Sequence, residues 1–255
     1  MIWQWSKQAF VISDIRMNLA IDIGNTRLKI GLFKGRDQVG EANLGKEDWT
    51  DLKKILNVKG IERTILSSTS EVSMELETFL EEKFDYIRLT SETPLPLINL
   101  YRTPKTLGKD RLAGIIGAKE LFPNASCLVI DTGTCITYDL INQKGSYLGG
   151  NISPGITMRL KAMSDYTFAL PLVEKENLDS CRGYDTETAI RAGAVWGVIH
   201  EINGFIEQFS AQAENLEVII TGGDARLIQE FMNREIRLED QLVLIGLNKI
   251  LCYNA

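Results

Sequence analysis

The amino-acid sequence predicts an α/β protein made of two similar lobes with a cleft between them. Strand-like and helix-like segments alternate in both halves of the 255 residues, and each half opens with a strand–turn–strand segment that carries Asp and Gly at its bend. Such a recurrence within one chain indicates an internal duplication. With the boundary near Pro123, the first lobe spans residues 17–123 and the second spans residues 124–255.

The first lobe opens with the apolar run LAIDI after Asn18, which reaches a Gly-Asn-Thr turn and continues as the strand LKIGLF. We expect a further strand at RTILSS, an acidic helix across MELETFLEEKF and a proline-rich loop at TPLPL. An apolar helical face then runs from Leu112 toward Leu121, and Asp110 stands where the N-cap of this helix is expected.

The second lobe repeats the opening pattern in CLVIDTGTCITYDLI and ends with the strand LEVIITGG and a helical tail. A long amphipathic helix is expected from near Thr186, because apolar residues recur there at spacings of three and four. They are Ala189, Ala192, Trp196, Ile199, Ile202, Ile206 and Phe209. Gly193, Gly197 and Gly204 in this helix indicate either another backbone packed closely or a plain bend.

Composition excludes several classes of protein. The chain has 28 basic and 34 acidic side chains, and its formal charge of -6 repels a polyanion, so we expect no nucleic-acid partner. No run approaches the roughly 20 apolar residues of a membrane-spanning helix, and the start lacks a secretion leader, so a cytoplasmic location is expected. The cysteines form no CxxC pair, and the single histidine, His200, is interpreted as a surface or core residue rather than a catalytic one.

The first hairpin, DIGNTRLK, combines a carboxylate with a tight glycine turn. A phosphotransferase that holds ATP needs backbone amides near the phosphates and a carboxylate for magnesium, directly or through water. Asp22 lies at the strand end, Gly24 permits the turn, Asn25 and Thr26 offer polar contacts, and Lys29 adds positive charge. An ordinary hairpin prefers the same residues, and for this segment alone that interpretation is the better one.

The second hairpin changes this balance, because Asp131-Thr-Gly-Thr134 repeats an acidic turn with glycine in the other lobe. Two such turns that face each other from two lobes would hold the phosphates of a nucleotide between them. Together, the two hairpins favour a nucleotide-binding function over a purely structural one.

Paired DxGxT hairpins in a duplicated α/β chain resemble the superfamily of acetate and sugar kinases, heat-shock chaperones and actin. This resemblance implies actin-like (ribonuclease H-like) lobes. TLGKDR, VIDTGT, GGNISPG and ITGGDA also follow one another as in type III pantothenate kinases, from about Asn18 to the C-terminus. The most specific segment, GKDR at Gly108, is similar to the GxDR motif of that family. The resemblance implies ATP-dependent phosphorylation of pantothenate to 4'-phosphopantothenate, the first step of coenzyme A biosynthesis.

The resemblance also implies roles for individual residues. ATP would contact Asp22, Ile23, Gly24, Asn25, Thr26, Arg27, Leu28, Lys29 and Thr134. Pantothenate would contact Tyr101, Gly108, Lys109, Asp110, Arg111 and Thr186. Asp110 would be the catalytic base that takes the proton from the primary hydroxyl of pantothenate. Asp22 would serve Mg²⁺, and Asp131 would coordinate a monovalent cation, K⁺ or NH₄⁺.

Three of these residues also have an ordinary structural interpretation. Asp110 fits a helix N-cap, Tyr101 a loop aromatic that packs on a lobe, and Thr186 lies beside Asp185, so that either residue fits the cap of the long helix. A cap tolerates Asn in place of Asp, whereas a base does not, so substitution separates the two interpretations of Asp110.

Two glycine-rich segments and the chain start complete the comparison with the family. GGNISPG is expected to be a loop that closes on the cleft or a tight bend, and Gly222 and Gly223 match the adenosine-binding turn of the superfamily. Cys135 and Leu112 depart from the residues common in the family, but neither change removes a functional group. Residues 1–16 precede the usual start, so we interpret them as a mis-assigned or disordered extension ahead of Met17.

Two other functions remain open. One is phosphorylation of a different small molecule by a kinase of the same superfamily, and the other is a non-catalytic nucleotide-binding regulator. Intact acids at Asp22, Asp110 and Asp131 argue against the regulator. The resemblance further implies a homodimer with pantothenate bound near the subunit interface.

Overall fold

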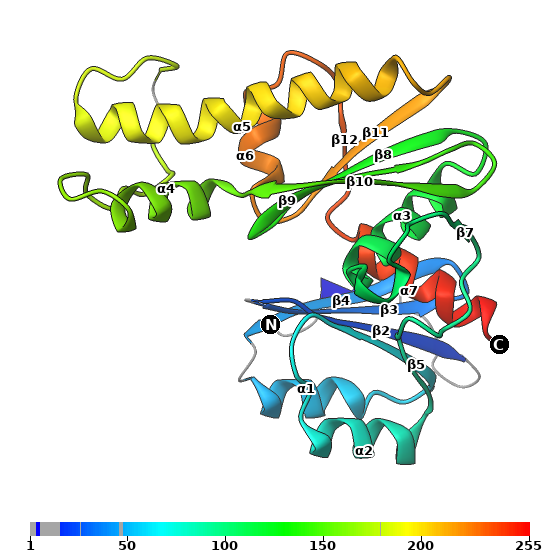
Figure 1. Ribbon diagram of the computed structural model, residues 1–255. Helices are drawn as coiled ribbons and strands as arrows, with labels where there is room; N and C mark the ends of the chain where they lie inside the picture. Colours follow the sequence, from blue (N-terminus) through cyan, green and yellow to red (C-terminus); the bar gives the residue numbers. More distant parts are fainter. Residues whose placement is uncertain (1–3, 6–15, 26, 46–47, 179) are drawn as a thin grey trace. The chain divides into compact units, whose positions relative to one another are not determined.

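The computed structural model describes residues 4–5, 16–25, 27–45, 48–178 and 180–255, which form two compact units (Figure 1). Unit 1 comprises residues 1–123, 145–147 and 241–255, and unit 2 comprises residues 124–144 and 148–240. The last residues, 241–255, were assigned from the sequence to the second lobe, whereas here they group with unit 1. Among the described residues, no helix has the length and apolarity needed to cross a membrane.

Unit 1 contains a six-stranded sheet with the order β1-β4-β3-β2-β5-β6. Its strands are β1 (Gln4–Trp5), β2 (Met17–Ile23), β3 (Arg27–Lys34), β4 (Asp37–Gly45), β5 (Ile61–Ser68) and β6 (Asp85–Arg88). Strands β2, β3 and β4 are antiparallel neighbours, while β5 and β6 continue the sheet in parallel with β2. Of the predicted extension 1–16, only Gln4–Trp5 and Arg16 are described, and the rest lies outside the described residues.

Helices cover both faces of this sheet (Figure 1). The helices α1 (Trp49–Leu56) and α2 (Met74–Lys83) pack on one face, and α3 (Lys109–Leu121) and α7 (Leu242–Tyr253) pack on the other. In β2, Leu19 and Ile21 face α1 and α2, while Ala20 faces α3 and α7. A strand buried on both sides has a continuous apolar run rather than an alternating one, which explains the LAIDI segment.

The sheet of unit 2 has the order β12-β11-β8-β9-β10 and repeats the topology of the first sheet. Its strands are β8 (Ser126–Thr132), β9 (Cys135–Ile141), β10 (Ser146–Pro154), β11 (Leu216–Thr221) and β12 (Arg237–Leu238). As in unit 1, a central strand pairs with an antiparallel hairpin partner on one side and a parallel strand on the other. The predicted α/β class and the internal duplication are therefore confirmed. The start of β10 pairs within unit 1 with β7 (Ile98–Asn99), which precedes a 3₁₀ turn at Pro104–Thr106.

Three helices, α4 (Ile156–Asp165), α5 (Thr186–Ser210) and α6 (Ala225–Glu230), share one apolar core with β8, β9 and β11. Helix α5 begins at Thr186, as the apolar spacing predicts, and Asp185 is its N-cap, in a capping box with Thr188. Of the two alternatives for Gly193 and Gly204, a closely packed backbone is not found, because no described atom outside the helix's own backbone lies within 4 Å of an added Cβ at either position.

Candidate active site

The first hairpin places a buried carboxylate at the end of β2. Asp22 is 9% exposed and is paired in register with Lys29 on β3 and Ser67 on β5. Residues paired in this way carry their side chains on the same face of a sheet, here the face that α3 and α7 cover. The Gly24 N–H donates to the Arg27 carbonyl at 3.0 Å and closes the turn.

The other predicted ATP contacts of this segment lie around the same turn. Ile23 ends β2, Asn25 is exposed in the turn, and Leu28 is buried in β3. Thr26 lies outside the described residues. The hairpin therefore has the form that the sequence predicts, although the contacts with ATP remain a prediction.

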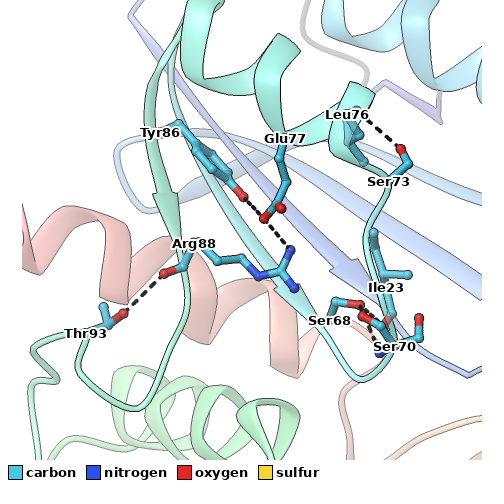
Figure 2. A network of polar contacts seen from close by, with 9 residues as sticks. All are labelled: Ile23, Ser68, Ser70, Ser73, Leu76, Glu77, Tyr86, Arg88 and Thr93. Carbon is cyan, nitrogen blue, oxygen red and sulfur yellow. Dashed lines mark hydrogen bonds and ion pairs between the residues drawn. The ribbon is translucent and has the colours of Figure 1, made fainter.

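Hydrogen bonds from the loop after β5 hold the end of β2 in place (Figure 2). The Ser68 hydroxyl donates to the carbonyls of Ser70 (2.7 Å) and Ile23 (3.5 Å), and the Thr69 N–H donates to the Ile23 carbonyl at 3.1 Å. These contacts fix the strand end that carries Asp22.

Figure 2 also shows how α2 is tied to β6 beside this loop. The Glu77 carboxylate accepts hydrogen bonds from Arg88 at 2.9 Å and from the Tyr86 hydroxyl at 3.4 Å. Burial raises the pKa of Tyr86 to about 12, so its hydroxyl remains protonated and can donate at neutral pH. The Ser73 hydroxyl accepts from the Leu76 N–H at 3.3 Å and caps α2.

The GKDR segment forms the start of α3. The sequence placed Asp110 at the N-cap, but the cap residue is Gly108, which makes no side-chain cap bond, and Asp110 is the second residue of the helix. The chain enters the helix with Gly108 extended (φ -56, ψ 134), so the first turn begins two residues earlier than expected. The Asp110 Oδ1 accepts from the Arg111 N–H at 2.8 Å, and the Lys109 ammonium donates to the Leu107 carbonyl at 3.2 Å.

Gly108 also leaves room for the Asp110 side chain. A Cβ added at Gly108 would lie 2.5 Å from the Asp110 Oδ1, closer than such contacts occur. Asp110 belongs to the helix that covers the Asp22 face of the sheet, because Ala113 and Ile116 of α3 pack in one core with Ala20 of β2.

Arg111 lies in an aromatic environment within unit 1. Its guanidinium donates to the Tyr147 hydroxyl at 3.1 Å and lies 5.7 Å from the centre of the Tyr101 ring. The two tyrosine rings stack with centres 6.0 Å apart. The structure therefore brings the predicted residues Tyr101 and Arg111 together and adds Tyr147. Sequence reasoning missed Tyr147 because pairing of β10 with β7, not sequence spacing, places it there.

The second hairpin, in unit 2, is packed against the ITGGDA turn. Gly222 has φ +99, and a Cβ added there would lie 2.6 Å from the Asp131 Oδ1 and from the Thr132 backbone. The Thr132 hydroxyl donates to the Thr221 carbonyl at 2.8 Å, and the Asp224 N–H donates to the Thr132 carbonyl at 3.1 Å. The Asp predicted to bind a cation and the predicted adenosine turn thus lie side by side.

The GGNISPG segment is mostly strand β10, not the loop or bend expected from its glycines. Gly150 lies against β9, where an added Cβ would be 1.7 Å from the Tyr138 carbonyl, so the glycine serves close strand packing. Gly155, after the strand, donates its N–H to the Thr134 carbonyl at 3.1 Å. Thr186 is the exposed first residue of α5.

Comparison with solved structures places this arrangement in a known class. A Baf family protein from Campylobacter jejuni is 22% identical, with a TM-score of 0.58 over 92% of this chain and 98% of that chain. The ROK hexokinase from Thermus thermophilus is 15% identical, with a TM-score of 0.50 over 93% of this chain and 99% of that chain. These likenesses define the fold as the duplicated actin-like α/β class that the sequence predicts.

Sequence comparison identifies the family within this class. The family model for type III pantothenate kinase matches residues 18–208. The type III pantothenate kinase of Bacteroides fragilis is 42% identical over 239 residues, which cover 93% of this chain and 98% of that protein. The chain belongs to the type III pantothenate kinase family.

Proposed function

We propose that this protein transfers the γ-phosphoryl group of ATP to the primary hydroxyl of pantothenate and so forms 4'-phosphopantothenate, the first step of coenzyme A biosynthesis. Beyond family membership, the observation that supports this proposal best is the start of α3. There Asp110 lies in the first helical turn, and Arg111 donates to the Tyr147 hydroxyl and lies over the Tyr101 ring.

Asp110 is proposed as the base. The hydroxyl oxygen of pantothenate attacks the γ-phosphorus, its proton passes to a carboxylate oxygen of Asp110, and the bond from the γ-phosphorus to the bridging oxygen breaks to release ADP. The Arg111 N–H holds Oδ1 of Asp110, which restricts the carboxylate to one orientation.

Arg111 is proposed to bind the carboxylate of pantothenate. A guanidinium offers a planar fork of donors that matches a carboxylate, and it also interacts favourably with an aromatic ring such as that of Tyr101. Arg111 is buried, at 8% exposure, and is bonded to Tyr147, so its orientation is set before substrate binds. Tyr101, Gly108, Lys109 and Thr186 are proposed to complete the pantothenate site.

ATP is proposed to lie against the two glycine turns, at Asp22–Lys29 and at Thr134. Kinase chemistry uses ATP with a divalent metal ion, and we propose Mg²⁺, served by Asp22 directly or through water. Asp131 is proposed to bind K⁺ or NH₄⁺. Mg²⁺ prefers oxygen ligands such as those of a carboxylate. Lys29, which is paired with Asp22 in the hairpin, supplies a positive charge that would attract the phosphates of ATP. The bound metal ion would neutralise charge on the phosphates.

A homodimer is also proposed. Large apolar side chains are exposed in unit 2, namely Tyr166, Phe168, Leu172 and Tyr184, and such residues are typical of protein interfaces. Light scattering coupled to size exclusion measures the mass directly, and a monomer at micromolar concentration would contradict the dimer.

The substrate is tested by a panel of acceptors. ADP release is measured with pantothenate, with hexoses and with small hydroxy acids, and the product is identified by mass spectrometry. The proposal predicts that pantothenate alone stimulates ADP release and gains one phosphoryl group. Stimulation by a sugar and not by pantothenate would assign the chain to another kinase activity.

A further inference from the structure

A partly buried cluster of polar side chains in unit 2 is formed by Tyr138, Ser153, Arg159 and Glu201. None of these residues has a role in the reaction proposed above. At its centre, the Glu201 carboxylate on α5 accepts hydrogen bonds from the hydroxyls of Tyr138 (2.8 Å) and Ser153 (2.5 Å) and from the Arg159 guanidinium (2.5 Å). Burial raises the pKa of Glu201, but the bonds from Ser153, Arg159 and Tyr138 outweigh it and hold this pKa below its ordinary value. Glu201 is therefore ionised at neutral pH.

Arg159 joins this carboxylate to the backbone at the end of β10. Its Nε donates to the Pro154 carbonyl at 2.9 Å, and its backbone N–H donates to the Gly155 carbonyl at 3.0 Å. The guanidinium packs over Gly197, where an added Cβ would lie 3.6 Å from Nη1. Gly197 precedes Glu201 by one helical turn, so both lie on the same side of α5.

The Pro154–Gly155 backbone in turn lies directly on the second hairpin. The Gly155 N–H donates to the Thr134 carbonyl at 3.1 Å, and a Cβ added at Gly155 would lie 2.6 Å from the carbonyl oxygens of Gly133 and Thr134. With so little space, a shift of Gly155 must move the turn as well.

We propose that Arg159 and Glu201 are positioning residues for the nucleotide: they hold Pro154–Gly155 against the turn at Gly133–Thr134 and thereby fix Thr134 where ATP is bound. This inference rests on the proposed function, in which Thr134 contacts ATP. Neither side chain needs to touch the nucleotide. A displacement of about 1 Å in a binding group is sufficient to reduce binding or rate strongly.

The substitution Arg159→Lys tests the positioning role, because lysine keeps the positive charge but lacks the fork that reaches both Pro154 and Glu201. Titration calorimetry with a non-hydrolysable ATP analogue and Mg²⁺ measures the dissociation constant. We expect it to rise about tenfold, in the range seen when groups that orient a ligand-binding residue are removed. The KM for pantothenate should change much less, because Tyr101 and Arg111 belong to unit 1 and only Thr186 among the proposed pantothenate contacts lies on α5 with Glu201.

A matched control is Arg234→Lys. Arg234 also pairs with a glutamate of α5, Glu207, at 4.0 Å, but both side chains of this pair are exposed. We expect Arg234→Lys to bind the ATP analogue with the dissociation constant of the wild type.

Ser153→Ala serves as a milder second variant, because it removes one hydrogen-bond donor to Glu201 and leaves the ion pair with Arg159 in place. We expect it to weaken binding of the ATP analogue several-fold.

A purely structural role predicts a different result. In that case Arg159→Lys and Ser153→Ala lower the melting temperature but bind the analogue like the wild type, which would overturn the inference. Because analogue binding is measured without pantothenate, failure of the proposed substrate shows in the acceptor panel and stays distinct from failure of the positioning role.

Discussion

Gly108 illustrates how a single residue separates stability from activity. An added Cβ would press on the end of the Asp110 side chain, which can rotate away at little cost to the fold. We therefore predict that Gly108→Ala lowers kcat by about tenfold to a hundredfold, because the proposed base leaves its position, while the melting temperature changes little. Steady-state kinetics and thermal unfolding measure the two effects.

The control for this substitution is Gly193→Ala. Outside the helix's own backbone, no described atom lies within 4 Å of a Cβ at Gly193, so kcat should be unchanged and the helix should gain about 0.5–1 kcal/mol from the better propensity of alanine. Loss of fold in Gly108→Ala, rather than loss of rate, would contradict the assignment of Gly108 as a spacer for Asp110.

At the scale of elements, α3 and α7 pack unusually closely. A Cβ at Gly246 would lie 1.8 Å from the Ala113 carbonyl, and one at Gly117 would lie 2.2 Å from the Leu242 carbonyl. Backbone cannot move aside as a side chain does, so Gly246→Ala should destabilise the fold by about 3 kcal/mol. Denaturant unfolding measures this loss, and a stability equal to that of the wild type would show that the helices do not touch at these glycines.

The contacts that join α4, α5 and β10 through Glu201 should depend on pH. Because its pKa in the folded state lies below the ordinary 4.5, ionised Glu201 stabilises the fold above that value, and this contribution is lost as the pH falls through the lowered pKa. We predict that the melting temperature of the wild type exceeds that of Glu201→Gln at neutral pH and that the difference shrinks below pH 4.5. A difference that is constant with pH would contradict this.

The elements that the sequence predicts well are those set by local chemistry. The two hairpins follow from glycine turns between apolar runs, and α5 follows from its apolar spacing and the cap at Asp185. Glycines were harder to interpret, because residue type does not reveal which neighbour they face. Gly193 faces open space, whereas Gly246 meets another helix. The same limit explains why Tyr147 was missed.

For the whole molecule, the return of α7 to unit 1 is the feature that the sequence did not predict. Its residues Leu244 and Leu247 complete the core that covers Ala20 and Ile65 in the first sheet. A fragment of residues 17–123 keeps α3 but leaves the part of that apolar face under α7 uncovered, and we predict that it does not fold alone. A version with residues 241–255 joined through a flexible linker should recover cooperative unfolding.

Circular dichroism during thermal unfolding distinguishes the two fragments. A cooperative transition in the shorter fragment, equal to that of the longer one, would show that α7 is not needed for unit 1. This experiment tests the division of the chain without reference to any substrate.

The whole enzyme phosphorylates pantothenate, and we propose Asp110 as its base. The most direct measurement compares pantothenate-dependent ADP release by the wild type and by Asp110→Asn, with binding of an ATP analogue measured in parallel. We predict that the wild type releases ADP only with pantothenate, and that the variant loses about 10²- to 10⁴-fold in rate while it binds the analogue normally. A variant that retains the wild-type rate, or a wild type that ignores pantothenate, would contradict the account.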